Sequence, residues 1–209
     1  MGQGRLERLA PLAGAAFAVV FAIGLLTSDT PDTSASGEEI IAHYDDSGTI
    51  FVTIFALLIA AVLFMFFASV LREVLHQATG APEWLASTVY AGAIIFTVAL
   101  AIFGMTQIML IDASDLKQPE VAQALNIFDN DNFMPAVVGI TLMYLATGWH
   151  VLRSGLLPKW LAWVSVVLGV ACLAGPAGFV AFLAFPIWVL IVSVLLYQRQ
   201  GRTAPAGAA

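Results

Sequence analysis

The residues best suited to chemistry in this 209-residue chain are uncharged polar side chains set inside long apolar stretches. Gln107 and Thr106 are neighbours, Thr97 precedes them in the same stretch, and Thr141 lies in a later one. Amides and hydroxyls inside a membrane protein can bind a neutral solute, because lipid offers no hydrogen bonds of its own. The same groups can instead bond to their own helix or to a neighbouring one. The sequence therefore predicts a polar site at these four residues, with helix bonding as the alternative.

The positions of the ionisable residues argue against ion transport. The apolar stretches carry no Asp, Glu, Lys or Arg at mid-depth, whereas pumps and charged channels need such groups inside the membrane. The three histidines are His43, His76 and His150, and a haem or catalytic zinc site needs more ligands in a defined pattern. We expect ordinary interfacial histidines, with a paired His76–His150 site as the alternative. No metal and no cofactor is predicted.

Residues 129–132 read Asp-Asn-Asp-Asn, which resembles the start of a calcium-binding loop. Such a loop needs Gly at position six and Glu at position twelve, and these positions hold Met134 and Ile140. We therefore expect a solvated turn before the next helix. Neither a Gly-x-Ser-x-Gly motif nor a phosphate-binding loop is present, and the single cysteine, Cys172, lies in an apolar stretch. No catalytic residue is predicted.

The composition is that of a membrane protein. Hydrophobic residues make up 60% of the chain and charged residues 11%, against about 45–50% and about 25% in soluble domains. Eight Lys and Arg against fourteen Asp and Glu give a net charge of −6, which argues against nucleic-acid binding. The lipid bilayer is thus the expected partner.

Six apolar segments are long enough to cross a membrane as helices, which needs about 20 residues each. We predict an all-α transmembrane bundle with a single domain, a tight turn over Gly175–Gly178, a kink at Pro186, and a flexible cytoplasmic tail over residues 198–209. The six predicted spans cover residues 9–26, 50–71, 84–111, 133–152, 160–175 and 179–197.

Basic residues fix the predicted orientation, because Lys and Arg of short loops stay in the cytoplasm. Six spans place every Lys and Arg except Lys117 on one face, which also holds both termini. Both termini are therefore predicted to be cytoplasmic. Most tryptophans fall near the cytoplasmic interface, whereas Trp188 lies mid-span and is expected to pack between helices.

Two long outer loops are each predicted to contain a short helix that lies on the membrane or caps the bundle. Ser36 and Glu39 have the spacing of a capping box, and Pro119 suits a first helical position. The two loops with their following spans also align at an offset of about 81 residues, ending in Val-Leu-Arg at 70–72 and 151–153. Either an internal repeat or chance similarity explains this alignment.

Small residues recur every fourth position along the first span, at Ala10, Gly14, Ala18 and Ala22. Such a stripe lets another helix approach closely. It predicts a packing face for a helix of the same chain or, alternatively, for another subunit or membrane protein.

Three short sequences carry a resemblance to a known group. They are Arg-Ser-Gly-Leu-Leu-Pro-Lys-Trp-Leu-Ala-Trp at 153–163, Glu-Glu-Ile-Ile-Ala-His-Tyr at 38–44 and Val-Ala-Gln-Ala-Leu-Asn at 121–126. The chain resembles uncharacterised multi-pass membrane proteins of actinobacteria, a group of the domain-of-unknown-function type. The resemblance implies a bacterial cytoplasmic membrane and no assigned activity.

Three functions remain open from the sequence. A non-catalytic structural or accessory component of the envelope would have a packed bundle without a polar cavity. A carrier or binder of neutral or lipid-like molecules would have a cavity near Gln107 and Thr141. A lipid-modifying enzyme would gather four outer side chains into one site: His43, Asp45, Asp46 and Asp129.

Overall fold

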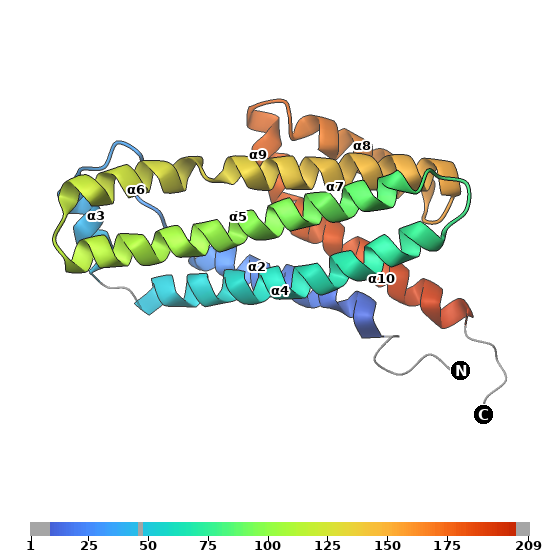
Figure 1. The fold of residues 1–209 in the computed structure, drawn as a ribbon, viewed down its shortest axis with the longest axis horizontal. Helices are drawn as coiled ribbons and strands as arrows, with labels where there is room; N and C mark the ends of the chain where they lie inside the picture. The colour runs from blue at the N-terminus through green and yellow to red at the C-terminus, as the bar shows by residue number, and fades with distance from the viewer. Residues whose placement is uncertain (1–8, 46–47, 204–209) are drawn as a thin grey trace.

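The computed structural model describes residues 9–45 and 48–203, and every element in them is a helix (Figure 1). In chain order these elements are η1 (Ala10–Leu12), α2 (Ala13–Thr27), α3 (Gly37–Tyr44), α4 (Gly48–Gln77), α5 (Trp84–Asp115), α6 (Pro119–Asp131), α7 (Phe133–Ser154), α8 (Lys159–Ala171), α9 (Pro176–Leu183) and α10 (Phe185–Thr203).

Long apolar helices form the body of the molecule. In the described residues four helical segments are long and apolar enough to cross a membrane: Ala10–Thr27, Gly48–Gln77, Trp84–Asp115 and Pro119–Ser154. A bent pair near the C-terminus makes a fifth if its two parts count as one span. The all-helical fold is thus confirmed, with four or five segments long and apolar enough to cross a membrane, while a count of six spans stays a prediction.

The fourth of these segments joins two helices of different character. Residues 133–152 in α7 are apolar, whereas α6 carries Glu120, Asp129 and Asp131 among its thirteen residues. Because the apolar stretch begins at Phe133, we expect α7 rather than α6 to cross the membrane.

The predicted fifth span is shorter than expected. α8 has 13 residues, about 20 Å of helix, whereas the hydrocarbon core of a bilayer is about 30 Å thick. The connection after it occupies residues 172–175 instead of the predicted 175–178, because Pro176 already begins α9. Proline is well suited to a first helical position, and Gly175 precedes it with a φ of 58°.

The last predicted span is broken rather than continuous. Ala177–Leu183 and Phe185–Arg199 meet at an angle of 41°. Pro186 explains the bend, because proline has no N–H to donate and its ring clashes with the preceding turn. The helix continues to Thr203, so residues 198–203 of the predicted flexible tail are helical, and 204–209 lie outside the described residues.

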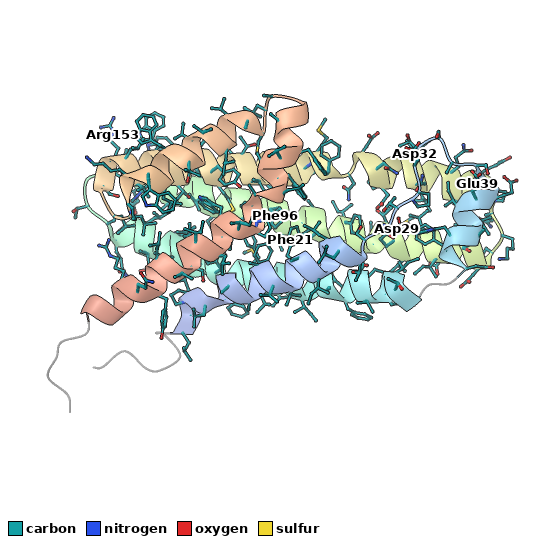
Figure 2. The ribbon with its side chains drawn as sticks, turned by 180° about the vertical axis from the view of Figure 1, so that it is seen from behind. Phe21, Asp29, Asp32, Glu39, Phe96 and Arg153 are labelled. Carbon is teal, nitrogen blue, oxygen red and sulfur yellow. The ribbon has the colours of Figure 1, made fainter. Side chains whose placement is uncertain are left out.

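Aromatic side chains fill the centre of the bundle, where Figure 2 labels Phe21 and Phe96. Phe64 lies 4.8 Å from Phe17 and 4.9 Å from Phe96, measured between ring centroids, and Phe96 lies 5.0 Å from Phe185. All of these rings are buried. They come from α2, α4, α5 and α10, so a single aromatic cluster joins four helices.

Trp188 extends this cluster, as its mid-span position predicted. Its side chain is 2% exposed, and its indole N–H donates to the Ser165 hydroxyl of α8 at 2.8 Å. The remaining tryptophans, at 84, 149, 160 and 163, are exposed. Their positions fit rings that meet the membrane interface.

The small-residue stripe of the first span faces helices of its own chain. Gly14 lies against the Phe67 ring of α4, so closely that an added Cβ would sit 2.5 Å from it. Ala18 is buried, while Ala10 and Ala22 are half-buried. The Ser193 hydroxyl of α10 also accepts from the Ala15 N–H at 3.1 Å, which fixes the first span between α4 and α10.

At the outer end, α6 continues the line of α7 beside α5, and α3 packs against both α5 and α6 (Figure 1). The predicted capping box of α3 is present, with Ser36 N–H donating to Glu39 at 2.8 Å and Glu39 N–H to the Ser36 hydroxyl at 3.3 Å. Ile40 and Tyr44 of α3 then pack into a second apolar cluster with Leu110 of α5. α3 therefore joins the ends of α5 and α6, and we call α3 and α6 together the outer cap.

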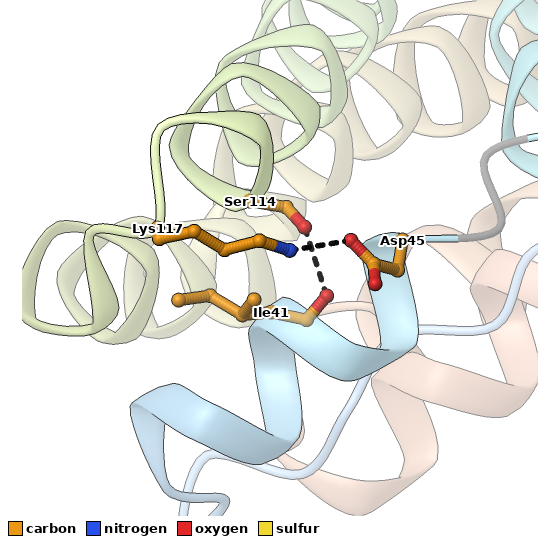
Figure 3. A network of polar contacts seen from close by, with 4 residues as sticks. All are labelled: Ile41, Asp45, Ser114 and Lys117. Atoms are coloured by element: carbon orange, nitrogen blue, oxygen red, sulfur yellow. Dashed lines mark hydrogen bonds and ion pairs between the residues drawn. The ribbon is translucent and has the colours of Figure 1, made fainter.

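Polar contacts join the end of α3 to the end of α5 (Figure 3). The buried Ser114 hydroxyl donates to the Ile41 carbonyl at 2.8 Å, and Lys117 pairs with Asp45 at 2.7 Å. The ion pair is solvent-exposed, and such pairs contribute little. The buried Ser114 bond thus anchors the cap more firmly.

α5 and α7 approach each other most closely at a pair of glycines. A Cβ added to either Gly92 or Gly139 would lie 2.6 Å from the carbonyl oxygen of the other. Gly104, on the same helix, has only ordinary contacts at 3.8 Å. The Gly92–Gly139 contact thus depends on the absence of a side chain.

We predict that Gly92→Ala lowers the thermal unfolding midpoint of the purified protein, because the added methyl must push α7 away at a cost of about 1–3 kcal/mol. Gly104→Ala is the matched control and should leave the midpoint unchanged or raise it. Equal effects of the two substitutions would contradict the close contact between α5 and α7.

Candidate functional site

A buried hydrogen-bonded chain of three side chains lies beneath the outer cap. Gln107 of α5 is 3% exposed. Its Oε1 accepts from the Tyr44 hydroxyl of α3 at 2.9 Å, and its Nε2 donates to Asp129 Oδ2 of α6 at 2.9 Å. One amide therefore connects three helices.

Asp129 is the buried acid of this chain. It is 5% exposed and also accepts from the Thr30 hydroxyl at 3.3 Å. Burial raises the pKa of its carboxyl to about 6, against the opposing effect of these hydrogen bonds. The expectation of a solvated turn at residues 129–132 was therefore wrong for Asp129, because α6 turns Ala122, Asn126 and Asp129 inward on one face.

Two asparagines of α6 hold the preceding loop in place. Asn126 Nδ2 donates to the carbonyls of Pro31 at 3.2 Å and Asp32 at 3.1 Å, and Asn130 Nδ2 donates to Pro31 at 3.1 Å. These bonds position Thr30 beside the Asp129 carboxyl, so the loop after α2 belongs to the site.

Tyr44 donates a hydrogen bond to the Gln107 amide, and its phenol stays protonated. Burial, reinforced by the nearby Asp129 carboxylate, raises the pKa of the phenol above its ordinary value of 10. Since the phenol is a donor at neutral pH, it fixes the Gln107 amide with its oxygen toward Tyr44 and its nitrogen toward Asp129. The carboxyl thus always faces a hydrogen-bond donor.

A cavity of about 210 Å³ adjoins Gln107. Its other lining residues are mostly polar and come from the first span, α3 and α4. They are Thr27, Ser28, Asp29, His43, Thr49, Ile50 and Thr53. Hydroxyls, an amide and a histidine could orient a small neutral molecule here.

The three threonines predicted beside Gln107 are not part of this cavity. Thr97, Thr106 and Thr141 each donate to the carbonyl four residues earlier in their own helix, at 2.8, 3.0 and 2.7 Å. This is the alternative that the sequence left open. Of the four predicted residues, only Gln107 lines the polar cavity.

The histidines have separate partners. His43 Nε2 lies 3.1 Å from the Asp29 carbonyl oxygen, His76 pairs with Glu83 at 3.1 Å, and His150 lies 3.3 Å from the Ser154 hydroxyl. In the part of the chain that the structure describes, no three His, Cys, Asp or Glu side chains form a metal-binding group.

The outer residues proposed for an enzyme site also have different surroundings. Asp45 pairs with Lys117 at the surface, His43 contacts the Asp29 backbone, and Asp129 bonds to Gln107 inside the cap. Asp46 lies outside the described residues. No hydrogen bond or ion pair of the described residues joins His43 or Asp45 to Asp129.

Comparison of the chain with protein-family models, with curated proteins and with solved structures found no match.

Stability is predicted to depend on pH through Asp129. Its pKa is raised from 3.8 in the unfolded chain to about 6, so the folded protein binds this proton more tightly. The resulting stability is complete below about pH 4 and is lost as the pH rises through about 6, on the order of 2–3 kcal/mol in all.

Asp129→Asn removes this titration, so the gap in unfolding midpoint between variant and wild type should change between pH 4 and pH 8. Midpoints measured by thermal unfolding across that range test this. Asp131→Asn, on the exposed side of α6, is the control and should follow the wild type. A constant gap for Asp129→Asn would show that the carboxyl titrates normally.

Proposed function

We propose that this protein is a non-catalytic structural or accessory component of a bacterial cytoplasmic membrane. The observation that carries the proposal is the aromatic cluster of Phe17, Phe64, Phe96 and Phe185, whose buried rings fill the bundle centre. Ring pairs contribute about 0.5–1.5 kcal/mol each beyond their buried area. A centre packed in this way favours a fixed body over one that opens alternately to each side.

The polar groups of the spans support the same conclusion. Thr97, Thr106 and Thr141 use their hydroxyls within their own helices. A solute path needs side chains that are free to exchange partners, whereas these already have intrahelical acceptors. The polar cavity at Gln107 lies at the outer cap and not among the aromatic rings.

An exposed apolar stripe offers the surface for lipid or for a partner. Phe55, Ile59, Val62 and Phe66 of α4 are all more than half exposed and recur at helical spacing. We infer that this stripe contacts the bilayer and that part of it contacts another membrane protein or a second copy of the chain.

We also propose six crossings with both termini in the cytoplasm. The start of α2 and the end of α10 lie at the same end of the bundle (Figure 1). Arg153 lies toward that end, whereas Asp29, Asp32 and Glu39 lie at the opposite one (Figure 2). This distribution supports the predicted positive-inside orientation. The resemblance to actinobacterial proteins supports the assignment to a bacterial membrane.

A second candidate function is the binding of a small neutral molecule at the outer face. The cavity of about 210 Å³ beside Gln107 favours it. Most of its lining residues are polar, and the cap of α3 and α6 lies at the same end of the bundle. The aromatic centre argues that such a molecule is bound without crossing the membrane.

The topology is tested by labelling single cysteines in intact cells in a Cys172→Ser background. Ser34→Cys and Ala174→Cys are expected to react with a membrane-impermeant maleimide added outside. Gln198→Cys should react only after the membrane is permeabilised. Protection of Ala174→Cys from outside reagent would contradict six crossings, and outside labelling of Gln198→Cys would contradict the orientation.

The structural role is tested by native mass spectrometry of protein extracted gently from its own membrane. We expect masses above one chain, from copies or from defined partners, and Phe66→Ala on the exposed stripe should reduce them. Phe128→Ala, on the exposed face of α6, is the control. A single chain that retains a small molecule would instead support the second candidate.

A further inference from the structure

A second cavity, of about 140 Å³, lies between the outer half of the first span and α7. We call it the outer crevice. Its walls come from α2, α4, α5, α7 and α9, and most of its lining is apolar, including Phe21, Leu57, Phe103 and Phe182. Asp129 and Asn132 provide polar groups in the same lining. One cavity therefore combines an apolar wall with a polar end.

The polar end has both an unused acceptor and an unused donor. Asp129 Oδ1 and Asn132 Nδ2 are buried without a hydrogen-bond partner, in side chains that are 5% and 8% exposed. Leaving such groups unpaired is unfavourable by about 1–3 kcal/mol each. A bound group that donates to the carboxylate and accepts from the amide would satisfy both.

The unpaired acceptor of Asp129 and the unpaired donor of Asn132 together restrict which polar head groups can bind. An ammonium group donates but cannot accept from Asn132, whereas a phosphate or carboxylate accepts but brings negative charge to Asp129. A hydroxyl group has one proton to donate and lone pairs to accept. Among these head groups, an uncharged hydroxyl is the one that can both donate to Asp129 and accept from Asn132.

The crevice has its polar and apolar ends in the same order as a lipid molecule in the outer leaflet. Asp129 and Asn132 immediately precede the apolar stretch that starts at Phe133, so they lie at the outer edge of the membrane. Phe21 lies seven residues before Ser28, another lining residue, and is thus about 10 Å deeper along α2. A ligand in the crevice would have its polar end at the interface and its apolar part toward the bilayer centre.

We propose that the outer crevice binds the hydroxyl end of an uncharged lipid of the diacylglycerol class. The hydroxyl donates to Asp129 and accepts from Asn132, and an acyl chain follows the wall formed by Phe21, Phe103 and Phe182. This site goes beyond the structural role proposed above and does not depend on it. It adjoins the polar cavity at Gln107, with which it shares the lining residue Ser28.

Three matched probes test the head group. Dioleoylglycerol, its acetylated form without the hydroxyl, and dioleoyl phosphatidic acid are each added to the purified full-length chain, and retention is measured by native mass spectrometry. We expect dioleoylglycerol to bind about tenfold more tightly than the acetylated form, which leaves Asp129 unpaired. Equal retention of the two, or preferred retention of phosphatidic acid, would overturn the proposal.

Variants locate the bound lipid. Ala136→Phe fills the crevice beside Asn132 and should abolish the preference for dioleoylglycerol, and Ala99→Leu, on the opposite wall, should do the same if the first variant fails to fold. Ala124→Phe, on the exposed face of α6, is the control and should retain the preference. Undiminished binding in a folded Ala136→Phe or Ala99→Leu protein would place the lipid elsewhere and overturn the assignment.

Discussion

A buried amide must find hydrogen-bond partners, and the way Gln107 does so organises the outer end of this protein. Its oxygen binds Tyr44 and its nitrogen binds Asp129, which ties both cap helices to α5. Asp129 in turn holds Thr30, and the neighbouring Asn126 holds the same loop. Each of the two outer cavities borders this series of hydrogen-bonded side chains, one at Gln107 and the other at Asp129.

The membrane-level part is held together by a different kind of contact. There the helices meet through aromatic rings such as Phe64 and Phe96, and through the glycine pair Gly92 and Gly139. These contacts are apolar and close, as expected where helices associate by van der Waals packing in lipid. The protein thus combines a tightly packed body, which has a few hydrogen bonds between helices such as that from Trp188 to Ser165, with an outer end organised around a buried polar chain.

The sequence predicted the features that depend on local chemistry. The capping box at Ser36, the packing of Trp188 and the bend near Pro186 each follow from one residue type and its immediate neighbours. Gln107 was also singled out, because an amide in an apolar stretch needs partners. Which partners it has could not be predicted, since Tyr44 and Asp129 lie 63 and 22 residues away. The burial of Asp129 was missed because α6 mixes polar and apolar residues on its inner face.

The order of the cap helices along the chain has a consequence for biosynthesis. α3 emerges from the ribosome long before its partners, because Gln107, which accepts the hydrogen bond of Tyr44, follows it by 63 residues. At roughly 5–20 residues per second, Tyr44 waits roughly 3 to 13 seconds for that partner. In the orientation that we propose, the first outer loop has crossed the membrane during this interval without its cover, with Ile40 and Tyr44 open to the aqueous side. The nascent chain therefore passes through a stage at which a chaperone or a protease on that side can reach a segment that is sealed in the finished protein.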